Sequence, residues 1–188
     1  MKSRLGIIAE DRSDVEVVTA IACKVAGRSL VIRSFVGHGC GKLRGKCRQW
    51  ATDLYNQQCK MLIVIRDLDT ANLLSLRGEL SAALDPSPIA DHLIVIAVRE
   101  IEAWLLSDSS AIRKALALKK PVPTVHNPES IAKPKEKLEH MIYVTSGKTK
   151  RYLSTVHNQR IAAELDFRQV RRCRSFVPME SFLKAHTT

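Results

Sequence analysis

Two aspartates one residue apart, Asp67 and Asp69, follow an unbroken apolar run at residues 61–65. The run has the length of a strand and is rich in β-branched residues, which predicts a strand buried on both faces of a parallel sheet. Ligands of open α/β sheets bind beyond the carboxyl ends of the strands. An Asp-x-Asp in extended chain points both carboxylates to the same side, as a shared Mg²⁺ site requires. The alternative interpretation is a solvated turn, in which Asp is also common.

Two further predicted strands are followed by acidic residues. Glu10 comes after the apolar run at 5–9, and Glu100 and Glu102 come after the run at 91–98. Because the carboxyl ends of parallel strands lie at one edge of a sheet, we expect these side chains to meet the aspartates there. Carboxylates at one edge repel one another unless cations neutralise them. The predicted ligands of Mg²⁺ or Mn²⁺, which prefer oxygen donors, are Glu10, Asp67, Asp69, Glu100 and Glu102.

The predicted elements alternate between strands and helices up to Asp108. Ser13 and Glu16 match a capping box that opens the first helix, and another strand ends at Val36. The order β-α-β-α-β-α-β predicts an α/β fold with a doubly wound, Rossmannoid parallel sheet of about four strands flanked by helices. The later residues are helical in pattern and poor in strands. We therefore expect a core at residues 1–108 and a helical appendage, residues 109–188, packed on it.

Basic residues outnumber acidic ones, since 30 Lys and Arg oppose 19 Asp and Glu for a net charge of +11. A basic surface beside an acidic cluster favours nucleic acid as a partner, and a solvated basic surface is the alternative. Lys148 and Lys150, in a basic loop, are candidate catalytic cations that would neutralise charge developing on a phosphate. The predicted nucleic-acid contacts are Lys42, Arg44, Lys148, Lys150, Arg151, Arg171 and Arg172.

Three features favour a cytoplasmic protein that does not enter a membrane. No apolar run approaches the roughly 20 residues of a membrane-spanning helix. Acidic residues follow the short N-terminal apolar stretch at once, unlike the pattern of a signal peptide. The five cysteines are odd in number and include no Cys-x-x-Cys pair, which fits reduced thiols better than a disulfide framework.

Several segments of the chain carry a resemblance to known proteins. They are residues 7–10 with Asp14, and residues 64–69, 100–108, 134–136 and 161–166. The chain resembles the Toprim fold of topoisomerases, primases and OLD-type nucleases. More narrowly, it is similar to the small stand-alone Toprim-like proteins of the DUF4276 type, which are often encoded beside ATPases in prokaryotic defence loci. Two departures are Asp11, where Gly is expected, and residues 150–154, where a Tyr-x-Lys run is usual.

This resemblance implies a Mg²⁺-dependent nuclease that acts on DNA or RNA. Glu10 would be an acid/base or a metal ligand, Asp67 and Asp69 would hold the metal, and Glu102 or Glu100 would complete the site. The resemblance also implies a role in antiphage defence with an ATPase partner of the AAA or ABC type. Two alternatives stay open: a catalytically inactive Toprim-like docking subunit, and a receiver-like regulatory module with its acids around one Mg²⁺.

Overall fold

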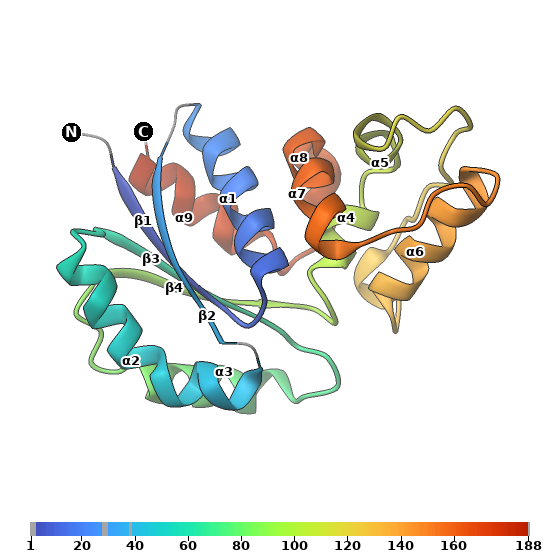
Figure 1. Ribbon diagram of the computed structural model, residues 1–188. Helices are drawn as coiled ribbons and strands as arrows, with labels where there is room; N and C mark the ends of the chain where they lie inside the picture. Colours follow the sequence, from blue (N-terminus) through green and yellow to red (C-terminus); the bar gives the residue numbers. More distant parts are fainter. Residues whose placement is uncertain (1–2, 28–29, 38, 188) are drawn as a thin grey trace.

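The computed structural model describes residues 3–27, 30–37 and 39–187 (Figure 1). Strands and helices alternate in the first part of the chain, and the remainder is helical. In chain order the elements are β1 (Arg4–Ala9), α1 (Arg12–Ala26), β2 (Val31–Val36), α2 (Cys40–Asn56), β3 (Met61–Asp67), α3 (Leu73–Leu84), β4 (Asp91–Ala97), α4 (Glu102–Leu106), α5 (Ser109–Ala115), the 3₁₀ helix η1 (Pro128–Ser130), α6 (Pro134–Thr145), α7 (Ser154–Glu164), α8 (Phe167–Val170) and α9 (Val177–Thr187).

The strands form one parallel sheet in the order β2-β1-β3-β4. Ile7 of β1 lies opposite Ser34 of β2 and Ile63 of β3, and Ile63 lies opposite Leu93 of β4. This arrangement confirms the predicted α/β fold with a parallel sheet flanked by helices. Since β1 and β3 are neighbours, the chain leaves β1 toward one edge of the sheet and leaves β3 toward the other. The switch point between them is where open α/β sheets bind ligands.

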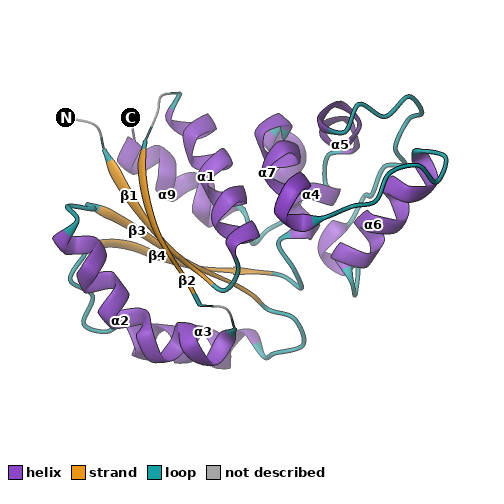
Figure 2. Ribbon diagram, in the orientation of Figure 1, coloured by secondary structure: helices purple, strands orange, loops and turns teal. Residues whose placement is uncertain are grey.

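Side-chain alternation along the strands builds two hydrophobic layers, one on each face of the sheet. In β3, Ile63 and Ile65 pack in the layer that contains α1, whereas Leu62 and Val64 pack in the layer that contains α2 and α3. Figure 2 shows the two groups of helices on opposite sides of the orange strands. Burial on both faces explains why β3 is almost entirely apolar, because every side chain of a central parallel strand contacts a helix layer.

The helices after β4 share the core of the α1 face rather than building one of their own. Leu5 of β1 and Leu183 of α9 belong to the same buried cluster. Trp104 of α4 packs edge-on against Phe176, with 5.5 Å between the ring centroids, and both side chains are fully buried. The C-terminal helices therefore pack largely on the α1 side of the molecule: α7 and α9 contact α1, and α9 also contacts β4. In the described part of the chain, no helix is both long and apolar enough to cross a membrane.

The first helix begins two residues earlier than the sequence pattern predicts. Asp11, not Ser13, is its N-cap, and Asp11 and Asp14 cap each other's backbone N–H groups, with 3.2 Å from Asp11 N to Asp14 Oδ2. The prediction was wrong because Asp11 with Asp14 offers the same capping arrangement closer to the end of β1, so it closes the shorter connection. As a result, Asp14 lies in the first turn of α1, beside the carboxyl edge of the sheet.

Candidate acidic site

An acidic cavity of about 180 Å³ lies at the carboxyl ends of β1 and β3. Seven carboxylates line it, together with Ser13 and one lysine, Lys135. All five predicted metal ligands lie in this lining, joined by Asp11 and Asp14. The lining carboxylates are Glu10, Asp11, Asp14, Asp67, Asp69, Glu100 and Glu102.

The aspartates after β3 do not continue in extended chain, so that part of the prediction was wrong. Asp67 ends the strand, and its Oδ1 accepts a hydrogen bond of 2.9 Å from the backbone of Ile101. Asp69 has a φ of 49°, in the left-handed region, and its N–H donates to the carbonyl of Arg99 at 2.8 Å. Arg99 also has a positive φ, 65°. The loops after β3 and β4 thus both turn sharply and lie side by side. Groups of one loop accept hydrogen bonds from the backbone N–H groups of the other, so these N–H groups do not remain without partners.

Glu102 is the carboxylate of the site with the smallest exposed fraction, 4%, followed by Asp14 at 6%. It stands at the start of α4, and its Oε1 accepts hydrogen bonds from Tyr152 Oη at 3.1 Å and from Asn158 Nδ2 at 3.2 Å. Tyr152 and Asn158 are buried and also contact each other. We call these three side chains the Glu102 network. It fixes one carboxylate oxygen, because a buried carboxylate must have hydrogen-bond partners.

The N-terminus of α6 is tied to the cavity through Glu100. Glu100 Oε2 accepts a hydrogen bond of 2.7 Å from the backbone N–H of Lys135, which follows Pro134 at the first helical position. This contact places Lys135 among the residues that line the cavity. On the opposite side, Arg66 Nε lies 3.3 Å from Glu10 Oε2, an ion pair that lacks the alignment of a hydrogen bond. Lys135 and Arg66 therefore offset only part of the negative charge of the seven carboxylates.

Burial and mutual repulsion make these carboxyl groups hold protons more tightly. Burial raises the pKa of Asp14 to about 7, and the negative charge of Glu102 acts in the same direction. Burial also raises the pKa of Asp67 well above its usual range, with further increases from Asp14 and Glu102. The pKa of Glu100 is raised as well, again chiefly by burial. Asp14, Asp67 and Glu102 thus form the mutually repelling centre of the site, which either protons or bound cations would relieve.

The donor set fits a hard cation, because every strong ligand in the lining is a carboxylate oxygen. Among the described residues, no three His, Cys, Asp or Glu side chains are already arranged around a common metal position. The assignment of a metal therefore rests on the donor chemistry and on the repulsion between carboxylates, rather than on preformed coordination geometry.

The predicted catalytic lysines lie in the loop between α6 and α7, outside the lining of the acidic cavity. The Lys150 ammonium donates to the carbonyl of Leu116, and Lys148 is exposed with a φ of 64°. The lysine that lines the cavity is Lys135. Its sequence signal was its place in the segment 134–136, one of those that carry the family resemblance, but the pattern assigned it no role in the site, since a Pro-Lys pair at a helix start by itself only predicts the helix.

The other predicted nucleic-acid contacts are spread over the surface. Lys42 is exposed in α2, and Arg44 pairs with Glu79 at 3.3 Å. Arg171 donates two hydrogen bonds to Glu180, of 2.8 and 2.6 Å. The Arg172 guanidinium donates to the backbone carbonyls of Ser107 and Gln169, while Arg151 lines a cavity beside α6. Arg171 and Arg172 thus have structural partners, whereas Lys42 and Arg151 remain exposed.

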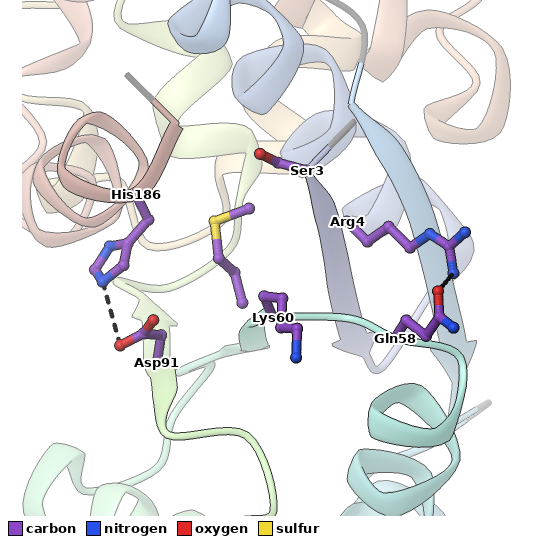
Figure 3. A pocket seen from close by; sticks show the side chains of 7 residues that line it. Ser3, Arg4, Gln58, Lys60, Asp91 and His186 are labelled. Atoms are coloured by element: carbon purple, nitrogen blue, oxygen red, sulfur yellow. Dashed lines mark hydrogen bonds and ion pairs between the residues drawn. The ribbon is translucent and has the colours of Figure 1, made fainter. Parts of the chain in front are cut away.

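A larger cavity, of about 530 Å³, lies at the opposite, amino edge of the sheet (Figure 3). Its polar side chains interact in separate pairs: Arg4 donates to Gln58 at 2.9 Å, and His186 lies 3.5 Å from Asp91. None of the predicted site residues lines it. Since its charged groups do not converge, the acidic cavity is the stronger candidate for chemistry.

The fold and the acidic cavity together define a class: a doubly wound α/β protein with a carboxylate site at the switch point of its sheet. The family model described as Domain of unknown function (DUF4276) matches residues 9–184. The chain therefore belongs to this family, and the match covers every residue of the acidic site. Comparison with curated proteins and with solved structures gave no match.

Proposed function

We propose that this protein is a Toprim-like nuclease that uses Mg²⁺ or Mn²⁺ to cleave phosphodiester bonds of DNA or RNA. The observation that carries the proposal is the acidic cavity, where Asp14, Asp67 and Glu102 repel one another at the switch point of the sheet. Such a costly arrangement of charge is expected where cations are bound. Bound ions of this kind polarise a phosphodiester and activate water for in-line displacement.

The side chains have distinct roles in this proposal. Asp67, Asp14 and Glu102 hold the cation, and the Glu102 network orients one of these ligands before metal arrives. Glu10 is a further ligand or the general acid/base, since it is half-buried and compensated by Arg66. Lys135, the lysine in the lining, replaces Lys148 and Lys150 as the cation that we place against the phosphate.

A biological role follows from the resemblance to stand-alone Toprim-like proteins. On that basis we extend the proposal to antiphage defence beside an ATPase partner. An inactive docking subunit is the competing function, because such a subunit can keep its carboxylates while another protein supplies the chemistry.

Substitution of Asp67 by Asn tests the nuclease proposal. The change keeps the shape and one hydrogen-bond acceptor for Ile101 but removes one charge from the cation site. Cleavage in Mg²⁺ or Mn²⁺ is expected to fall about 100-fold or more, equivalent to about 3 kcal/mol of transition-state stabilisation. Stability in metal-free buffer should be kept or raised, because repulsion between carboxylates is relieved.

Asp53→Asn in α2, outside the acidic cavity, is the matched control and should cleave like the wild type. Cleavage is measured on single- and double-stranded DNA and RNA, with and without EDTA, and with and without any ATPase that is encoded beside this protein. If no wild-type preparation cuts any substrate, the nuclease proposal fails and the docking-subunit function takes its place.

A further inference from the structure

A further cavity, of about 410 Å³, lies along the exposed face of α6, and we call it the α6 cavity. Four of its lining residues recur at helical spacing, so they share one side of the helix. The opposite side packs into the core through Leu138, Met141 and Ile142, which fixes the helix in place. The lining residues are Glu136, Glu139, His140 and Tyr143 from α6, and Arg151 from the loop that precedes α7.

At two points of the chain, a residue of the α6 cavity is the sequence neighbour of a residue of the acidic site. Lys135 lines the acidic cavity, and the next residue, Glu136, lines the α6 cavity. Arg151 lines the α6 cavity, and the next residue, Tyr152, contacts Glu102 through its hydroxyl. From Lys135 to Tyr143 the helix rises about 12 Å, at about 1.5 Å per residue. Tyr143 is therefore within reach of a nucleic-acid strand that has one phosphate at the acidic cavity and extends along α6 by a few nucleotides.

The side chains of the α6 cavity suit a base better than a phosphate. Tyr143 is 39% exposed and offers a ring face for stacking, and His140 offers a second flat ring nearby. Glu139 repels phosphate but can accept hydrogen bonds from an exocyclic amino group, as carboxylates do with cytosine. Arg151 has no hydrogen-bond or ion-pair partner within the described residues, so its guanidinium is available to the strand.

We propose that the α6 cavity binds an unpaired nucleobase of a single strand whose phosphate lies at the acidic cavity. This inference rests on the proposed nuclease function and names its substrate class, single-stranded nucleic acid, with a preference for bases that carry an amino group. A base inside a duplex is stacked and paired, so it cannot enter a cavity on a protein surface without being extruded.

The test measures binding of fluorescent oligonucleotides of about 12 residues by anisotropy, all on the Asp67→Asn background so that cleavage is suppressed. The probes are oligocytidine and oligothymidine, oligocytidine in a duplex, and oligocytidine as RNA to separate the two kinds of strand. Tyr143→Ala should weaken binding of single-stranded oligocytidine about tenfold, or about 1.4 kcal/mol, with a much smaller effect on the duplex. Tyr143→Phe, which keeps the ring, should restore binding. Glu139→Gln should reduce the preference for cytidine over thymidine.

Tyr55→Ala is the matched control, because Tyr55 is 50% exposed but lies on α2, outside the α6 cavity. Equal effects of Tyr143→Ala and Tyr55→Ala would overturn the inference and leave the α6 face as a surface for a protein partner. In that case the nuclease proposal would survive if Asp67→Asn still abolished cleavage. A wild-type protein that neither binds nor cuts any of these nucleic acids would refute both.

Discussion

At the scale of single residues, the buried carboxylate of Glu102 is oriented by two side chains from the last third of the chain. Both hydrogen bonds, from Tyr152 and Asn158, reach Oε1. Side chains that hydrogen-bond to a metal ligand, without binding the metal themselves, generally raise the metal affinity about 10- to 100-fold. We therefore expect Tyr152→Phe to weaken Mn²⁺ binding about tenfold, measured by titration calorimetry. Tyr143→Phe removes a hydroxyl from an exposed tyrosine and should leave the affinity unchanged, whereas equal losses in both variants would contradict a positioning role.

Asp14 links the protonation of the site to the stability of the fold. Its pKa is raised to about 7, first by burial and then by the neighbouring carboxylates, whereas the ordinary value is 3.8. Between these values the folded state binds more protons than the unfolded state, so the free energy of unfolding falls as the pH rises. Urea unfolding in metal-free buffer, on both sides of this pH window, should show the decrease.

Asp14→Asn should lose much of this pH dependence, because the amide does not ionise yet keeps an oxygen that accepts the Asp11 N–H. The pH dependence that remains in this variant is expected to come from Asp67, whose pKa is also raised. Added Mn²⁺ should stabilise the wild-type protein more at the upper end of the window than at the lower end, since metal replaces protons on the carboxylates. A variant with an undiminished pH slope would show that Asp14 is not the linked group.

At the scale of elements, the close contact between β1 and α2 depends on Gly6, which has no side chain. A Cβ on Gly6 would lie 2.9 Å from Leu54 Cδ1, in a fully buried contact. Gly6→Ala is therefore expected to destabilise the protein by about 1–3 kcal/mol, as overpacking of a core generally does. Combining it with Leu54→Val, which lacks the clashing carbon, should recover part of the loss in urea unfolding.

Gly78→Ala in α3 is the matched control for that substitution. Gly78 is exposed in a helix interior, and a Cβ there would meet no atom within 4 Å. Alanine should stabilise the helix by about 0.5–1 kcal/mol, because glycine loses more backbone entropy on folding. The two glycines should therefore respond to the same change with opposite signs, and a common sign would contradict the packing argument.

At the scale of the whole molecule, the net charge of +11 coexists with a carboxylate-lined cavity. The loop between α6 and α7 carries Lys148, Lys150 and Arg151 on the side of the molecule that holds the α6 cavity. Replacing all three by Gln should flatten the dependence of log affinity on log salt by about 2–3, roughly one per lost phosphate contact. Titration of an oligonucleotide at several salt concentrations measures this slope.

The control removes the same charge from cations that already have acidic partners. Lys114, Arg168 and Lys184 pair with Glu164, Asp166 and Glu180, respectively. Since each of these cations is already partly neutralised, their replacement by Gln should change the slope less. Equal slopes in the two triple variants would mean that nucleic acid responds to net charge alone and not to the loop.

The local sequence pattern was sufficient to predict the sheet and the position of the acidic residues that follow its strands. The apolar runs around Ile7 and Ile63 are too β-branched and too short for buried helices, and a parallel sheet brings the carboxyl ends of its strands together by topology. Glu10, Asp67 and Glu102 could therefore be placed at one edge before any contact was known. The family model that matches residues 9–184 confirms the DUF4276 part of the resemblance.

Tertiary structure decided which other side chains reach that edge, because the segments that carry the resemblance include Asp14 and residues 134–136 but give them no place in the site. Asp14 joins the site because α1 starts at Arg12, and helix starts vary by a residue or two whenever several capping residues compete. Tyr152 reaches Glu102 across 50 positions of sequence, and Lys135 enters the lining through its backbone contact with Glu100, 35 positions away. Such contacts depend on how the C-terminal helices pack against α1 and α4. Periodicity describes the face that one element buries, but it does not specify which distant element covers that face.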